Sequence, residues 1–289
     1  MNKIALGTAQ FGKNYGISNK IGQVSFENAK KILKFAKNID IDLIDTAISY
    51  GNSEKIIGNV GIRDFKIVTK LPAPSVDVVD IQKWVNEQIN FSLKKLGIKS
   101  LYGLLVHNSE SLIGSSGEKI LKSLEKLKSE KIIKKVGISI YEPSELDKMQ
   151  ELFKPDIIQI PLNIFDQRFL SSGWLTKLFK SDIEIHSRSI FLQGLLLMSQ
   201  QERFYKFNKW DGMWKVWHEW LSDNRITALE ATTRFAFSLK EISKVIVGVE
   251  TKEQLEKIML ASNGKLPSIP AELSINDINL LNPSNWKKL

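Results

Sequence analysis

Four ionisable side chains stand at or just beyond the ends of short apolar runs in the sequence. Asp45 ends one run and Tyr50 follows it in LIDTAISYG, residues 43–51. Lys70 closes FKIVTK, and His107 closes LYGLLVH. A buried carboxylate is costly unless it is paired or hydrogen-bonded. We therefore expect Lys70 to be the partner of Asp45, with both beside the Tyr50 hydroxyl.

Together these four side chains could protonate and polarise a carbonyl group. A free tyrosine has a pKa of about 10, but a neighbouring ammonium group stabilises the phenolate and lowers that pKa. We expect Asp45 to keep Lys70 charged, and His107 to orient a carbonyl oxygen beside Tyr50. The set contains neither a nucleophile nor an electron source, so a hydride-donating cofactor has to be supplied.

The elements that carry these residues alternate regularly. Longer amphipathic stretches, such as GEKILKSLEKLKSEK, separate short runs rich in β-branched and other apolar residues. Runs of this kind are typical of parallel strands buried on both faces. The predicted strands are residues 3–9, 41–47, 65–70, 101–107, 134–140, 156–162, 183–190 and 244–250.

Eight such units predict one α/β domain, residues 1–289, folded as a (β/α)8 barrel (TIM barrel). A doubly wound open sheet is the alternative. It would be favoured by a G-x-G-x-x-G spacing after the first strand, which GTAQFG does not have. Catalytic groups of such barrels stand at the C-terminal ends of the strands. Asp45, Tyr50, Lys70 and His107 would then meet at the ends of three neighbouring strands.

Composition limits the classes of protein and partner. The chain has 289 residues, 43% of them hydrophobic, and no cysteine, which excludes disulfides and thiolate chemistry. Its first apolar run has only three residues, and no run reaches the roughly 18 that a membrane span needs, so we expect a cytoplasmic protein. The net charge is +9, but the lysines are scattered beside glutamates. We expect a solvated surface rather than a nucleic-acid or membrane partner.

The longest connection runs from about residue 193 to residue 225, and a connection of that length is usually functional or partly helical. It places four tryptophans on one helical face, and we expect this stripe to pack on the barrel rather than to stack on a ligand: Trp210, Trp214, Trp217 and Trp220. We expect His186 and His218 to be structural. The three histidines are far apart in the sequence, so we predict no metal site.

The four residues in the contexts DTAISYG, VTK and VHN resemble the catalytic tetrad of the aldo-keto reductases. The similarity covers nearly the whole chain, because LGTAQFG, VGIS, SIFLQGLL and VIVGVETKEQLE resemble the first, fifth, seventh and eighth strands of that family. The resemblance implies reduction of an aldehyde or ketone, with sugar-type carbonyls included, by NAD(P)H that lies across the barrel mouth. Tyr50 would be the proton donor.

The resemblance also implies a cofactor site, made of Thr8, Asp45, Ser139, Gln159, Arg188, Gly194, Gly248, Glu250, Thr251 and Gln254. Ser139 and Gln159 match positions that bind the nicotinamide carboxamide, and Arg188 replaces a tyrosine that usually stacks on the nicotinamide ring. Gly194 and residues 248–254 match the pyrophosphate and adenosine end.

Three positions depart from the family pattern. Ile140 and Ile258 each replace an asparagine, and Glu250 stands where a basic residue often meets the 2′-phosphate of NADP(H). Lys252, Lys257 and a helix N-terminus nearby can still receive a phosphate. We therefore favour NADP(H), with NAD(H) also possible.

Two other functions remain compatible with the sequence. One is a cofactor-binding regulatory or redox-sensing barrel with little turnover. The other, based on charge alone, is association with nucleic acid. The loops after Tyr50, after His107 and at 193–210 carry no transferable code for a substrate, so the sequence predicts neither a particular carbonyl compound nor an oligomeric state.

Overall fold

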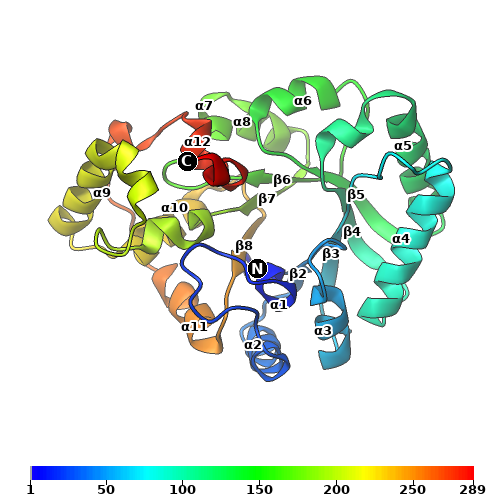
Figure 1. Ribbon diagram of the computed structural model, residues 1–289, viewed down its shortest axis with the longest axis horizontal. Coiled ribbons are helices and arrows are strands. Elements are labelled where there is room, and N and C mark those ends of the chain that lie inside the picture. Colours follow the sequence, from blue (N-terminus) through cyan, green and yellow to red (C-terminus); the bar gives the residue numbers. More distant parts are fainter. Residues whose placement is uncertain (1) are drawn as a thin grey trace.

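The computed structural model describes residues 2–289, in which eight parallel strands close into a barrel (Figure 1). Each strand pairs with the next in sequence, and the last pairs with the first. The predicted barrel is therefore confirmed, with strand ends trimmed by a few residues. The strands are β1 (Ile4–Gly7), β2 (Leu43–Asp45), β3 (Lys66–Leu71), β4 (Leu101–Val106), β5 (Ile133–Ser139), β6 (Ile157–Pro161), β7 (Glu184–Arg188) and β8 (Lys244–Gly248).

The interior of the barrel is arranged in layers, because every second residue of a strand faces the same side. The middle layer is an apolar cluster of Ala5, Leu43, Val68, Leu105, Ile157 and Ile246. Two residues further along the same strands come Gly7, Asp45, Lys70, His107, Gln159 and Gly248. The alternation that builds the apolar layer thus also brings the polar residues together above it.

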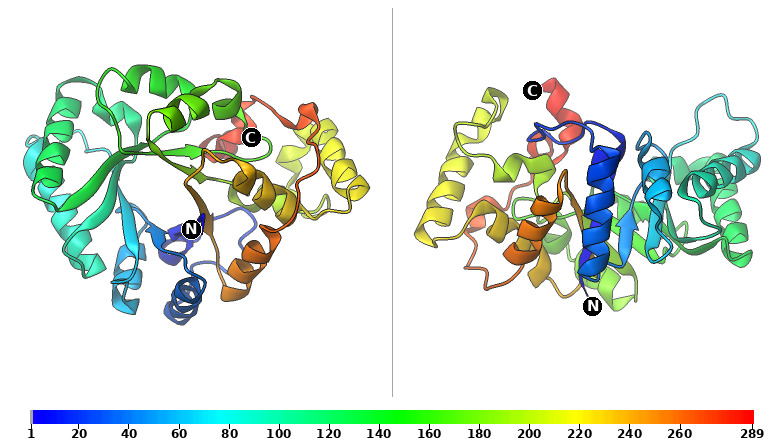
Figure 2. Two further views of the ribbon diagram at one scale, coloured as in Figure 1. Left: turned by 180° about the vertical axis from the view of Figure 1, so that it is seen from behind. Right: turned by 90° about the horizontal axis from the view of Figure 1, so that it is seen from below.

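Helices surround the strands, and Figures 1 and 2 show them as a ring around the barrel. None of those described is long and apolar enough to cross a membrane. The α-helices are α1 (Ala9–Gly12), α2 (Phe26–Asn38), α3 (Ser53–Val60), α4 (Ile81–Leu96), α5 (Gly114–Ser129), α6 (Pro143–Met149), α7 (Arg168–Ser171), α8 (Trp174–Lys180), α9 (Asp211–Asp223), α10 (Ala228–Ser238), α11 (Lys252–Ala261) and α12 (Ile278–Leu281). Short 3-10 helices are η1 (Ser109–Leu112), η2 (Leu192–Leu197), η3 (Tyr205–Trp210), η4 (Ala271–Leu273) and η5 (Pro283–Lys288).

Three residues of the tryptophan stripe lie on α9, at the edge of the molecule in Figure 1, and Trp210 ends η3 just before it. Trp214 and Trp217 are fully buried, with ring centroids 5.2 and 5.4 Å from that of Phe165 in the segment after β6. The Trp220 indole N–H donates to the carbonyl of Ser268 at 2.8 Å. The predicted packing role is confirmed, although the stripe meets the post-β6 segment and the C-terminal region rather than the outer faces of the strands.

Two glycines fix the backbone around Tyr50. A Cβ added to Gly12 would lie 1.6 Å from the carbonyl oxygen of Tyr50. Gly51 has φ +56, a left-handed conformation, and a Cβ there would lie 2.4 Å from the carbonyl oxygen of Gly12. The end of α1 therefore touches the loop after β2 backbone to backbone, with no room for a side chain between them.

We predict that Gly12→Ala displaces this loop and lowers the free energy of unfolding by about 1–3 kcal/mol, as overpacking usually does. Gly212→Ala is the matched control, because Gly212 lies in α9 with open space around it and should be neutral or slightly stabilised. Urea denaturation of both variants tests this. Equal stability of Gly12→Ala and the wild type would contradict the close contact.

Candidate active site

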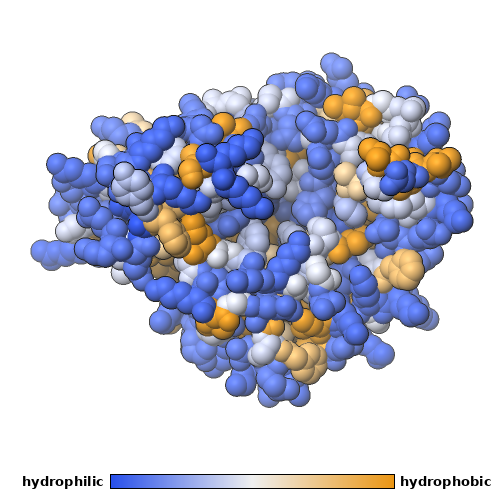
Figure 3. Space-filling model, in the orientation of Figure 1, coloured by the Kyte–Doolittle hydropathy of each residue, from blue (hydrophilic) through white to orange (hydrophobic). Residues whose placement is uncertain are grey.

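A cleft of roughly 290 Å³ opens at the C-terminal ends of the strands. Figure 3 shows a hollow in the middle of one face of the molecule. Most of the predicted site residues line the cleft: Thr8, Asp45, Tyr50, His107, Ser139, Gln159, Arg188, Gly194, Gly248, Glu250 and Gln254. Of the remaining two, Lys70 is buried and bonded to Asp45, and Thr251 caps α11. The predicted convergence at the strand ends is confirmed.

Lys70 and Asp45 form a buried ion pair, as predicted. The ammonium nitrogen lies 2.6 Å from Asp45 Oδ2 and also donates to the carbonyl of Thr46 at 2.8 Å. The second carboxylate oxygen, Oδ1, accepts from Gln159 Nε2 at 2.8 Å. Only 1% of Lys70 and 4% of Asp45 is exposed. Burial lowers the pKa of Lys70, and the neighbouring Asp45 carboxylate opposes that effect. The two opposite charges therefore compensate each other beneath the cleft.

Tyr50 lies over this pair, with the Lys70 ammonium 5.2 Å from its ring centroid. Its pKa is raised above the usual value by burial and then by the Asp45 carboxylate, while Arg188 opposes the shift. This direction is opposite to the one expected from Lys70 alone. The reason is that burial disfavours the charged phenolate and the Asp45 carboxylate repels it. Tyr50 therefore keeps its proton at neutral pH.

His107 meets Tyr50 edge to face, with ring centroids 5.9 Å apart. Its Nδ1 lies 3.3 Å from the Ser49 hydroxyl. Burial, then the charges of Lys70, Arg188 and Lys13, lower the pKa of His107 to about 3. The imidazole is therefore neutral at physiological pH. It can offer one N–H to an oxygen in the cleft without bringing a charge.

Three predicted nicotinamide residues stand on adjacent strands β5, β6 and β7. Ser139 is buried, and its hydroxyl forms no hydrogen bond with the described part of the chain. Gln159 uses its amide nitrogen on Asp45, which leaves its carbonyl oxygen for other partners. The guanidinium of Arg188 already stacks on the Tyr141 ring at 4.2 Å, so only one of its faces remains open.

The other end of the cleft has an unusual backbone. Leu192 and Gln193 have φ +47 and +55, and Gly194 has φ +90. A Cβ on Gly194 would lie 1.8 Å from the hydroxyl of Ser18, so the segment of residues 13–24 crosses directly over this turn. The backbone N–H of Ile17 donates to the carbonyl of Gln193 at 3.0 Å.

Several predicted residues of the cofactor site already have internal partners. The fully buried Thr8 donates its hydroxyl to the carbonyl of Asp45 at 3.0 Å. The Thr251 hydroxyl caps α11 by accepting from the Gln254 N–H, and Gln254 Oε1 accepts from the Glu250 N–H at 2.6 Å. These side chains shape the cleft wall, while the Glu250 carboxylate has no partner among residues 2–289.

Other residues of the cleft were not predicted from the sequence. Tyr141 and Gln193, which follow β5 and β7, are among them, as is Tyr15 from the segment that crosses the mouth. Lys13 of the same segment stands beside Tyr50. Tyr141 is two residues beyond Ser139, so following the strand ends a little further could have found it. No signal in the sequence places residues 13–24 over the cleft.

The two histidines expected to be structural lie outside the cleft. His186 is buried in β7, and its Nε2 lies 2.7 Å from a carboxylate oxygen of Glu184. His218 is on α9, where its Nε2 lies 3.1 Å from an Arg203 nitrogen. Both contacts are consistent with the structural roles predicted for these residues.

A model of the Aldo/keto reductase family matches residues 3–270. The chain belongs to this family. Oxidoreductase sirO of Leptosphaeria maculans is 25% identical over 218 residues, which is 72% of this chain and only 65%, under two thirds, of sirO. The uncharacterized oxidoreductase YqkF of Bacillus subtilis (strain 168) is 23% identical over 286 residues, 92% of each chain.

Solved aldo-keto reductases share the fold at low sequence identity. The holo form of aldo-keto reductase AKR11C1 from Bacillus halodurans superposes with a TM-score of 0.72 at 16% identity, covering 92% of this chain and 88% of the other. The glycerol dehydrogenase AKR11B4 from Gluconobacter oxydans gives 0.70 at 20% identity, covering 93% and 88%. These comparisons support the (β/α)8 barrel of this aldo-keto reductase.

We predict that Lys70→Met lowers the free energy of unfolding by about 3–5 kcal/mol, because it leaves the Asp45 carboxylate buried without its cation. The double variant Asp45→Asn, Lys70→Met removes both charges and should be more stable than Lys70→Met. Urea denaturation of the single and double variants measures this coupling. Lys66→Met is the control, since Lys66 pairs with Asp42 near the surface and should cost about 1 kcal/mol or less. If the stability lost in the double variant equals the sum of the losses in Asp45→Asn and Lys70→Met, the two side chains are not coupled, and the assigned ion pair is contradicted.

Proposed function

We propose that this aldo-keto reductase reduces the carbonyl group of an aldehyde or ketone to an alcohol, with NAD(P)H as the reductant. The observation that carries the proposal is the position of Tyr50. It is protonated, lies over the buried Lys70–Asp45 pair and contacts the neutral His107 at the base of the cleft. A proton donor and an uncharged N–H donor at one point suit a carbonyl oxygen that becomes an alcohol oxygen.

The polar groups of the cleft fit a nicotinamide cofactor. The free Ser139 hydroxyl and the free carbonyl oxygen of Gln159 are a donor and an acceptor at one place, as a carboxamide requires. Gly194 and Gly248 line the opposite end of the cleft near the N-terminus of α11, whose backbone N–H groups suit a pyrophosphate. A reduced nicotinamide held in this way would supply the hydride to the carbonyl carbon.

Each residue near Tyr50 has a distinct part in this proposal. Tyr50 transfers its phenolic proton to the substrate oxygen, and its raised pKa keeps that proton available. Lys70 stabilises the phenolate that remains, because the negative charge on Tyr50 grows as the proton leaves. Asp45 holds Lys70 in position, and His107 directs the carbonyl oxygen toward the tyrosine hydroxyl.

We predict that Tyr50→Phe lowers kcat by about 10²- to 10⁴-fold, since it removes the general acid and leaves the ring in place. NADPH affinity should remain nearly unchanged. The assay is carbonyl-dependent oxidation of NADPH over a panel of small aldehydes, ketones and sugars. Tyr205→Phe is the matched control, because Tyr205 is exposed and outside the cleft.

Two outcomes of this assay would contradict the proposal. Near-wild-type turnover of Tyr50→Phe would remove Tyr50 as the proton donor. If the wild type binds NADPH but does not oxidise it with any carbonyl compound of the panel, the result would instead support the cofactor-binding regulatory barrel.

The cofactor preference depends on charges at the α11 end of the cleft. Glu250 and Lys257 both line this end, and Lys252 is drawn to Glu256 at 4.0 Å. The Glu250 carboxylate has no bonded partner and can turn to solvent, whereas the amides at the start of α11 are fixed in the helix. We therefore propose that the site prefers NADPH and that Lys257 receives the 2′-phosphate.

We predict that Glu250→Arg tightens NADPH about 10-fold by adding a charge-assisted hydrogen bond, and that it leaves NADH almost unchanged. Fluorescence titration with both cofactors measures the effect. Glu253→Arg makes the same charge change on α11 outside the cleft and should have a smaller effect. Tighter binding of NADH than of NADPH by the wild type would contradict the preference and would point to Glu250 bonded to the ribose 2′-hydroxyl.

A further inference from the structure

An uncompensated positive charge lines the cleft beside the proposed proton donor. Arg188 ends β7, is half-buried and has no carboxylate within ion-pair distance among residues 2–289. Its Nη2 donates to the carbonyl of Ile140 at 3.0 Å, and its Nη1 donates to the Ser189 hydroxyl at 3.3 Å. These contacts use two of the five N–H donors of the guanidinium. No hydrogen bond among residues 2–289 uses the others, and Arg188 lines the cleft.

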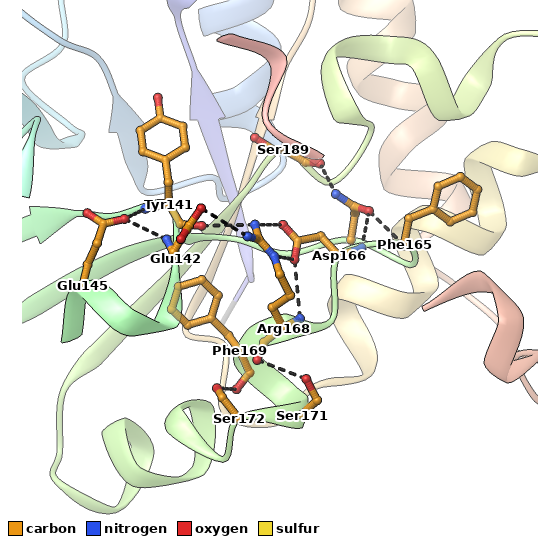
Figure 4. A network of polar contacts seen from close by, with 11 residues as sticks. Tyr141, Glu142, Glu145, Phe165, Asp166, Arg168, Phe169, Ser171, Ser172 and Ser189 are labelled. Atoms are coloured by element: carbon orange, nitrogen blue, oxygen red, sulfur yellow. Dashed lines mark hydrogen bonds and ion pairs between the residues drawn. The ribbon is translucent and has the colours of Figure 1, made fainter. Parts of the chain in front are cut away.

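The guanidinium is held in place by a polar network that lies outside the cleft. It stacks on Tyr141, whose backbone N–H donates to Glu145 Oε1 at 2.6 Å and whose carbonyl accepts from Arg168 Nη2 at 3.1 Å. Arg168 is itself fixed by Asp166 through two contacts of 2.8 Å. In Figure 4 the Tyr141 ring points away from this network. Arg188 is thus oriented before any ligand arrives, which lowers the entropic cost of binding.

A second cation lies at the mouth of the cleft. Lys13 is exposed and has its ammonium 5.8 Å from the ring centroid of Tyr50. Asp45 is the carboxylate next to Tyr50, and Lys70 already compensates it at 2.6 Å. The space around Tyr50 and His107 therefore carries the excess positive charge of Arg188 and Lys13. The far end of the cleft has its own cation, Lys257.

We infer that the carbonyl substrate of this enzyme carries an anionic group, a carboxylate or a phosphate, which the N–H edge of Arg188 binds while Lys13 attracts it to the mouth. The open face of the guanidinium, opposite Tyr141, is left for the stacking on nicotinamide that the sequence predicts. The inference rests on the proposed function and names the class of its substrate. A guanidinium presents paired N–H donors that match the oxygens of a carboxylate or phosphate. A cleft with uncompensated cations also concentrates anions and speeds their association.

The test compares aldehydes that differ in charge. Succinic semialdehyde is paired with butanal, and glyceraldehyde 3-phosphate with glyceraldehyde. For at least one pair we expect kcat/KM of the anionic member to be higher by on the order of 10- to 100-fold, the effect of one charge-assisted hydrogen bond. This preference should weaken as salt is added, because Lys13 is exposed. The pair with the larger preference identifies the anionic group.

Variants assign the preference to the two cations. Arg188→Gln should bring the ratio of kcat/KM for the anionic and neutral members close to one, whereas Arg188→Lys should keep part of it. Lys13→Gln should lower the ratio several-fold and flatten its salt dependence. Lys119→Gln removes an exposed lysine of α5, outside the cleft, and should leave the ratio unchanged. Equal kcat/KM of the wild type for the anionic and neutral members of both pairs, or an unchanged ratio in Arg188→Gln, would overturn the inference. The proposed carbonyl reductase activity would not be affected by either result.

A measurement without turnover separates this inference from the proposed function. Succinate and inorganic phosphate should raise the thermal unfolding midpoint of the NADPH-loaded wild type above that in sodium chloride of equal ionic strength. Arg188→Gln should lose this difference, and Lys119→Gln should keep it. If no carbonyl compound is reduced, the proposed function fails, but a stabilisation that depends on Arg188 would still support an anion site. Absence of any such stabilisation would overturn it.

Discussion

The buried ion pair of Lys70 and Asp45 is the constraint on which the site depends. Removing two charges from water is expensive, and the cost is recovered only if all their polar atoms find partners. Thr46 and Gln159 supply two of these partners, so residues at the end of β2 and within β3 and β6 are tied together at one point. A packed apolar pair could hold the same strands as firmly. The retained charges are better explained by the proposed need of Tyr50 for a cation when its proton leaves.

The layers of the barrel explain how one pattern serves both stability and chemistry. Ala5, Leu43, Val68, Leu105, Ile157 and Ile246 fill the interior, and the next inward positions carry the polar groups of the cleft. A shift of one residue in any strand would turn both sets away from the barrel interior, so the inward position of the apolar layer also fixes which polar side chains can face the cleft. The Gly12–Gly51 contact adds a second restraint on the loop that carries Tyr50.

The strand order, the barrel and the Asp45–Lys70 contact could be predicted from the sequence, because each follows from periodic burial and from the need to pair a buried charge. The direction of the Tyr50 pKa shift could not, because it depends first on how deeply Tyr50 is buried and then on the Asp45 carboxylate beside it. The stacking of Arg188 on Tyr141 and the path of residues 13–24 were also missed. These contacts join loops that are distant in the sequence, and loop conformation leaves no periodic signal.

The pairing of β1 with β8 has a consequence for folding during synthesis. Residues Ile4–Gly7 are made before the other strands of the barrel, yet one of their two partners, Lys244–Gly248, is made after all the others. Until then the sheet has two open edges, which can pair with other chains. Closing it requires contacts between distant parts of the chain, which form slowly. A nascent chain that stops before β8 holds Asp45, Tyr50, Lys70 and His107 but lacks the wall built from Gly248, Glu250 and Gln254. Binding of the proposed nicotinamide cofactor should therefore begin only after β8 and the start of α11 have been made.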